Sequence, residues 1–100
     1  MIEKVLFHQP VIKKDISNKE IHTEAFTATN HSSKEVHIVE VEKGCSCTNV
    51  EYPEVIQPGQ EFFIKMIVDK MGQTGYYATS AKIKFNTGQE QKLILNGKLI

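Results

Sequence analysis

Short runs in which apolar and polar residues alternate recur along this chain, and turn residues separate them. In the clearest run, 62–68, every second residue is apolar on one face, starting with Phe62 and Ile64. A period of two is typical of a β-strand with one buried face. No longer stretch keeps the 3.6-residue apolar period of an amphipathic helix. The pattern therefore predicts an all-β fold.

The predicted strands are short and together fit one architecture. We expect them over 5–7, 11–16, 22–29, 36–42, 48–52, 62–68, 77–85 and 93–99. Pro10 interrupts the first strand, which is typical of a sheet edge. At Val39 the alternation slips by one residue, which predicts a β-bulge. About seven antiparallel strands predict an immunoglobulin-like β-sandwich, with residues 1–100 forming a single domain.

The inward faces of these strands define the expected core. One hundred residues are enough for one domain with one modest core. The apolar residues expected to fill it are Phe26, Val36, Ile38, Phe62, Ile64, Met66, Val68, Ile83, Phe85, Leu93 and Leu95.

Charge and segment composition exclude some classes of function. Twelve basic residues balance twelve acidic ones, and all the basic residues are lysines. Readout of bases and phosphates depends on arginine forks, so we expect no nucleic-acid partner. No apolar run approaches the ~20 residues that span a bilayer, and the N-terminus lacks the apolar core of a signal peptide. We therefore expect cytoplasmic synthesis, with a virion as one destination, or an envelope or extracellular location if a signal was removed.

The two cysteines, Cys45 and Cys47, lie one residue apart after a predicted strand. In an extended strand such residues are separated by about 6.6 Å, close to the upper Cα limit for a disulfide. We therefore favour free thiols packed in the fold, with a disulfide or redox role and a metal site as alternatives. Zinc needs four ligands, and the four histidines are scattered. We expect no cofactor, and Cys45 and Cys47 are the only metal candidates.

Several aromatic and apolar side chains are candidates for contact with a protein partner. Phe63 and Ile67 lie on the face opposite the predicted core face of their strand. Tyr52, Tyr76 and Tyr77 are further exposed candidates, because aromatic residues are enriched at interfaces. The alternative for Phe63 and Ile67 is that a neighbouring segment covers them. No motif for a catalytic nucleophile, a phosphate loop or a metalloprotease is present, so we expect no enzyme activity.

The second half of the chain carries an ordered series of elements that resembles a known family. The series comprises Asn30, the run 36–42, Gly44-Cys45-Ser46-Cys47-Thr48, Pro58-Gly59, the run 64–69, Gly75, Asn86 and the closing run 93–97. It resembles a family of bacterial immunoglobulin-like domains abundant in Bacteroidetes, over roughly residues 20–100. The resemblance implies a β-sandwich related to ASPM/SPD-2/hydin and major-sperm-protein modules. Such modules serve as binding or spacer domains, and no catalysis is implied.

Together these observations predict a non-catalytic module that binds protein as an accessory component of a larger assembly. The most specific version is a phage capsid decoration protein that docks onto a repeating lattice. The alternative is an exported or envelope-associated domain whose Cys-x-Cys pair binds metal or handles thiols.

Overall fold

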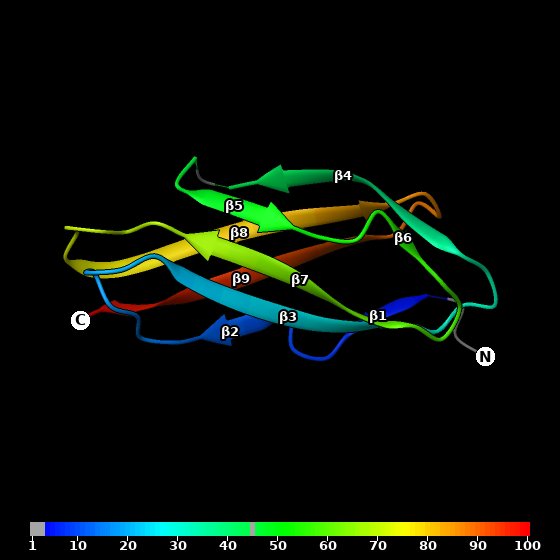
Figure 1. The fold of residues 1–100 in the computed structure, drawn as a ribbon, viewed down its shortest axis with the longest axis horizontal. Coiled ribbons are helices and arrows are strands. Elements are labelled where there is room, and N and C mark those ends of the chain that lie inside the picture. The colour runs from blue at the N-terminus through cyan, green and yellow to red at the C-terminus, as the bar shows by residue number, and fades with distance from the viewer. Residues whose placement is uncertain (1–3, 45) are drawn as a thin grey trace.

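The chain folds into two β-sheets packed face to face, as the computed structural model, which describes residues 4–44 and 46–100, shows (Figure 1). The strands are β1 (Val5–Phe7), β2 (Val11–Lys13), β3 (His22–Asn30), β4 (Val36–Lys43), β5 (Thr48–Glu51), β6 (Val55–Ile56), β7 (Glu61–Val68), β8 (Gly75–Phe85) and β9 (Glu90–Leu99). One sheet has the order β1-β3-β7-β5, and the other has the order β2-β9-β8-β4-β6. The predicted all-β, immunoglobulin-like sandwich is confirmed.

Most of the predicted strands form close to their expected positions. The differences concern the run 11–16 and the additional strand β6. The run 11–16 forms a strand only over β2, and β2 pairs with β9 in parallel rather than antiparallel. The two-residue strand β6 was missed because it is too short to show alternation. The slip at Val39 is confirmed as an irregularity between Ile38 and Glu40 in the pairing of β4 with β8. Over the described residues, no helix is long and apolar enough to cross a membrane.

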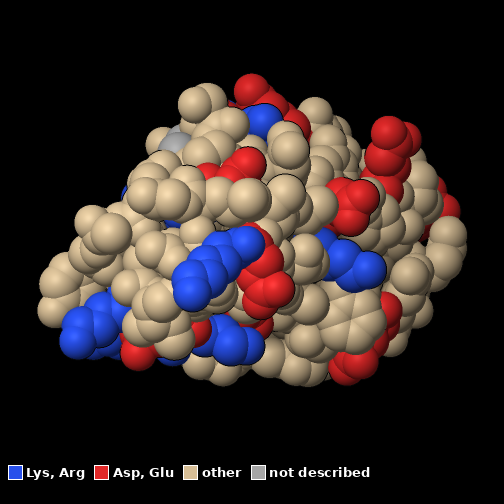
Figure 2. Space-filling model, turned by 60° about the vertical axis from the view of Figure 1, so that its left-hand side comes forward, with Lys and Arg blue, Asp and Glu red and all other residues tan. Residues whose placement is uncertain are grey.

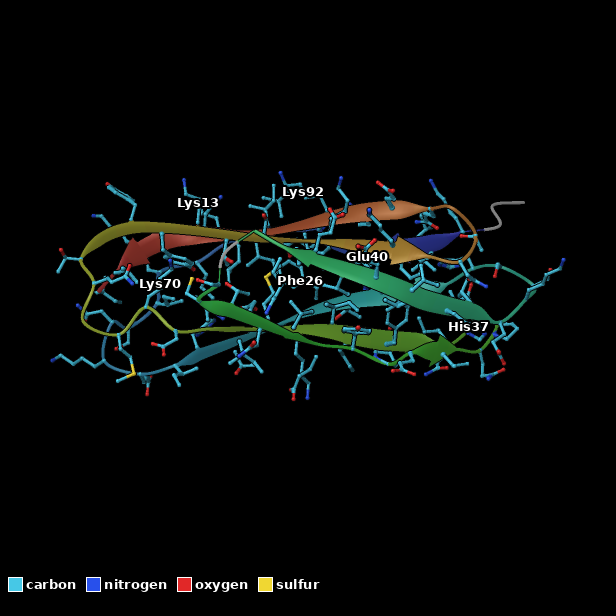
Figure 3. All side chains as sticks on the ribbon, turned by 90° about the horizontal axis from the view of Figure 1, so that it is seen from above. Lys13, Phe26, His37, Glu40, Lys70 and Lys92 are labelled. Carbon is cyan, nitrogen blue, oxygen red and sulfur yellow. The ribbon has the colours of Figure 1, made fainter. Side chains whose placement is uncertain are left out.

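The core lies between the two sheets, and every predicted core residue is buried. Phe26 projects into the space between them (Figure 3). Phe7 contacts this core edge-on, with its ring centroid 6.1 Å from that of Phe62 and 6.4 Å from that of Phe85. Apolar residues that were not in the expected core, such as Ile16 and Ile56, complete it. Alternation therefore predicted the strand faces correctly.

The side of the sandwich formed by β1 and β2 is closed by the chain itself. After β1 the chain crosses from one sheet to the other at Pro10, which explains the break in the first predicted strand. The backbone N–H of Val5 donates to Gln89 Oε1 at 3.0 Å, and Gln89 Nε2 donates to the carbonyl oxygen of Val5 at 2.7 Å. The side-chain amide of Gln89 thus satisfies backbone groups at the outer edge of β1.

Candidate protein-binding surface

The outer face of the four-stranded sheet carries the two apolar residues that sequence analysis singled out. Phe63 is 48% exposed, and Ile67 is partly buried. Both lie on β7, whose other face carries core residues. The prediction that Phe63 and Ile67 point away from the core is confirmed by this burial pattern. No segment of the described chain covers Phe63.

The strands on either side of β7 surround these residues with small, uncharged side chains. Phe63 lies opposite Thr27 of β3, and Ile67 lies between Thr23 of β3 and Asn49 of β5. One lysine, Lys65, stands between them. Because threonine and alanine methyl groups dominate, little charge must be desolvated when another protein covers this face. We call this surface, with Phe63 and Ile67 at its centre, the β7 face.

The three tyrosines of the prediction lie in different places. Tyr76 is 79% exposed at the start of β8, and Tyr52 is 38% exposed after β5. Tyr77 is only 5% exposed, and its hydroxyl donates a hydrogen bond to the carbonyl oxygen of Lys14. Burial raises the pKa of Tyr77 above its ordinary value. The prediction that Tyr77 is an exposed contact residue is therefore wrong; its alternation with Ile83 already placed it on the core face.

The structure also corrects the expectation of free thiols. Cys47 is disulfide-bonded, and the only other cysteine in the chain, Cys45, lies outside the described residues. The expectation assumed an extended strand, but Ser46 and Cys47 form a turn before β5 begins at Thr48. The premise of an extended strand therefore does not hold at Cys47.

A buried hydroxyl pair next to Cys47 joins the two sheets. Thr48 of β5 and Thr79 of β8 are 0% and 4% exposed, and their Oγ1 atoms are hydrogen-bonded to each other. The Cys47 sulfur lies 3.8 Å from Thr48 Oγ1. This polar contact fixes the start of β5 against the opposite sheet, because a buried hydroxyl needs a hydrogen-bond partner and each of these two supplies one to the other. Within residues 4–44 and 46–100, no group of three metal-ligating side chains could hold an ion.

Charged side chains on the outer face of the five-stranded sheet pair locally. Lys84 lies 3.3 Å from a carboxylate oxygen of Glu40 and 2.8 Å from one of Glu42. The hydrogen bond from the Lys84 ammonium holds the pKa of the Glu42 carboxyl below its ordinary value. Lys13 and Lys92 extend from the same sheet into solvent (Figure 3). Basic and acidic residues lie next to one another across the face drawn in Figure 2, rather than forming a patch of one sign.

Comparison with known proteins supplies the family. The model of the family described as "Protein of unknown function (DUF1573)" matches residues 9–99, nearly the whole chain. The chain belongs to the DUF1573 family. No match was found among curated protein sequences. That Gly44-Cys45-Ser46-Cys47-Thr48 is a signature of the family, and the link to Bacteroidetes, stay predictions.

Solved structures share the fold of this DUF1573 domain at low sequence identity. A protein of unknown function from Porphyromonas gingivalis W83 has a TM-score of 0.80 at 12% identity, covering 96% of this chain and 46% of that chain. The periplasmic chaperone SfaE has a TM-score of 0.73 at 12% identity, covering 95% and 56%. The ASH/PapD-like domain 7 of human CEP192 has a TM-score of 0.69 at 13% identity, covering 98% and 86%.

These likenesses, at 12–13% identity, establish the fold, whose strand arrangement this chain shares with a PapD-like/ASH domain and a periplasmic chaperone. The chain spans about half the length of the first and second of these structures. The predicted relation to ASPM/SPD-2/hydin modules agrees with the likeness to the ASH domain.

Proposed function

We propose that this DUF1573 domain binds another protein through the β7 face and acts as an accessory component of a larger assembly. The observation that carries the proposal is the exposure of Phe63 (48%) at the centre of a sheet face with little charge. Isolated apolar residues on a surface are ordinary, but an aromatic residue that shares a sheet face with a second apolar one fits the core of a small interface. Lys65, which stands between Phe63 and Ile67, and Glu51, which lies opposite Lys65 on β5, can supply polar contacts within this face.

A surface built from many copies of one protein, such as a phage capsid, is the most specific version of this proposal. Each docked copy would bury a modest area, and neighbouring copies would strengthen one another. The half-exposed Phe63 on the outer face of β7 supports this version, because many copies of a small contact can add up.

The double substitution Phe63→Lys and Ile67→Lys tests the β7 face. We expect the melting temperature to change little, because both side chains point outward, and partner affinity to fall at least about 30-fold, as for an interface hot spot. The measurement is affinity capture from cells of the source organism, with quantitative mass spectrometry of proteins recovered by the wild type but not by the variant.

The matched control is Val11→Lys, which places a lysine at an apolar residue that is 51% exposed on the other sheet. It should capture the same partner as the wild type. Equal recovery of that partner by the double variant, or loss of recovery with Val11→Lys alone, would place the interface elsewhere. Unfolding of the double variant would show that the two residues support the core.

The disulfide at Cys47 favours a second candidate function, an exported or envelope-associated domain that exchanges thiols. Disulfides persist in oxidising compartments such as the bacterial periplasm. While Cys47 is disulfide-bonded, its sulfur is not a thiolate and cannot ligate a metal ion. Of the two roles considered for the cysteine pair, the disulfide therefore favours thiol exchange over metal binding.

Two experiments test the second candidate: thiol alkylation tests for the disulfide, and a serine variant tests for thiol exchange. Purified without reductant, the protein should gain no alkyl groups on treatment with iodoacetamide, and it should gain two after dithiothreitol treatment, as measured by intact mass. A thiol-exchange role further requires that replacing Cys47 with serine abolish mixed disulfides with other proteins in cells. If the partner captured through the β7 face is unchanged in that variant, the cysteines are only structural.

A further inference from the structure

The side of the sandwich formed by β4 and β5 is open, unlike the side that Gln89 closes. The outer edge of β4 pairs with β6 only at Val36 and His37. From Val39 to Lys43, no strand in the part of the chain that the structure describes pairs with this edge. β5 pairs with β7 alone, so its outer edge is also vacant. The two strands belong to different sheets and lie side by side along the same flank (Figures 1 and 3).

A groove runs between these two vacant edges. It has a volume of about 210 Å³ and is lined by Val41, Lys43, Asn49, Val50 and Tyr52. Val41 and Val50 pack against the core from either sheet but remain partly exposed. The floor of the groove is therefore apolar, and an extended segment laid along it could bury every second side chain there.

The backbone of β4 offers hydrogen-bonding groups to such a segment. The N–H of Gly44 donates to the carbonyl oxygen of Ser80 in β8 at 2.8 Å. Because backbone groups in an antiparallel strand alternate between its two edges, those of Val41 and Lys43 point to the vacant edge. At the other end of β4 the N–H of Ile38 points the same way and donates to the carbonyl oxygen of Glu54. Ile38 and Val41 are three residues apart, so regular alternation would point their backbone groups to opposite edges. The bulge at Val39 adds one residue, and both therefore point to the vacant edge.

Charge determines which kind of segment fits. Glu40 and Glu42 lie on the outer side of β4, and the lysines opposite them, Lys84 and Lys82, lie on β8, away from the vacant edge. The two carboxylates are therefore the charged groups of β4 nearest to the outward side chains of an added strand. The side chains of an added strand that point outward would stand next to these carboxylates, which favours lysine or arginine. A second copy of this chain fits poorly: antiparallel pairing centred on Val41 would place Glu40 of one copy opposite Glu42 of the other.

We propose that the outer edge of β4 binds an extended, basic segment of a partner protein as an added strand. The segment would continue the row begun by β6, with apolar side chains in the groove against Val41, Val50 and Tyr52. Its alternate basic side chains would lie beside Glu40 and Glu42. Backbone hydrogen bonds supply affinity in this mode of recognition, and alternate side chains supply specificity. The site borders the β7 face at Asn49 but does not include Phe63 or Ile67.

Hydrogen exchange of the full chain, followed by NMR, tests this proposal with two synthetic peptides. One peptide alternates valine and lysine, and the other alternates valine and glutamate. At saturation the valine–lysine peptide should slow exchange of the Val41 and Lys43 amides at least about tenfold, because added-strand hydrogen bonds protect them. The valine–glutamate peptide should not. Absence of protection, equal protection by both peptides, or protection confined to β5 or the β7 face would overturn the proposal.

Val41→Pro removes the outward-pointing N–H without breaking a bond to β8. It should weaken binding of the valine–lysine peptide at least tenfold, whereas the double substitution Phe63→Lys and Ile67→Lys should leave this binding unchanged. Equal binding by a folded Val41→Pro variant would refute the added strand, and if that variant unfolds, the exchange map of the wild type decides. Concentration-dependent protection of Val41 without peptide would indicate pairing between copies and would also refute it. A failure of this proposal does not affect the proposed binding through the β7 face, because the capture experiment tests that binding with different variants.

Discussion

Replacing Phe62 with alanine is expected to lower the free energy of unfolding by about 3–5 kcal/mol. The Phe62 side chain is 3% exposed, and its ring contacts that of Phe7 between the sheets. Its removal loses the transfer free energy of a buried ring and leaves a cavity that strands on both sides hold open. A domain of this size has roughly 5–15 kcal/mol of total stability, so a large part would be lost. Chemical denaturation followed by circular dichroism measures the change.

The adjacent residue on β7 provides the control. Phe63 has the same side chain but points to solvent from the opposite face of the strand. Phe63→Ala should therefore cost less than about 1 kcal/mol. Similar losses at Phe62 and Phe63 would mean that both faces of β7 are buried in solution, and the β7 face would then not be available to a partner.

This pair of residues illustrates what the sequence could predict. Along 62–68 every second residue is apolar, and Lys65 lies on the other face, which identifies the strand and the face that turns inward. The slip at Val39 was equally readable, since a bulge changes the phase of the alternation. The outward direction of Phe63 follows from its neighbours, but only the structure shows that no other segment within the described ranges covers it.

Other features depend on contacts between distant parts of the chain. The groove exists because β4 and β5, close in sequence, join different sheets, and no local pattern says which sheet a strand will join. Free thiols are favoured over a disulfide on the assumption of an extended strand, whereas residues 46–47 form a turn. Tyrosine is common at interfaces, which suggests an exposed Tyr77. Its position an even number of residues from Ile83, however, places it on the core face of β8, where the structure has it.

Replacing Asn30 with aspartate is expected to destabilise the domain by about 3 kcal/mol or more near neutral pH. The Asn30 side chain is 0% exposed, and its Nδ2 lies near three backbone carbonyl oxygens, those of Lys34 (3.0 Å), Ile56 (3.3 Å) and Gln57 (3.1 Å). It therefore fixes the loop after β3 to the end of β6. Aspartate has the same shape but no amide hydrogens, so a carboxylate would face these carbonyl dipoles without a donor.

The effect of Asn30→Asp should depend on pH in a definite direction. Burial and the carbonyl oxygens disfavour the charged form, so the pKa of the new carboxyl in the folded state should lie above its unfolded value of about 3.9. Two hydrogen bonds from Ser32 to Oδ1 oppose this shift, but the three carbonyl acceptors and full burial outweigh them. The unfolded chain then releases its proton first, so stability falls as pH rises above about 4 and levels off above the folded pKa.

Urea denaturation of the wild type and of Asn30→Asp at about pH 4 and about pH 8 measures this difference. The loss of stability relative to the wild type should be larger at the higher pH. Asn30→Ala, which removes the donors without adding charge, is the matched control and should show a loss that does not change with pH. A pH-independent loss in the aspartate variant would mean that solvent reaches Asn30. The buried amide would then not be what holds the β3 and β6 loops together.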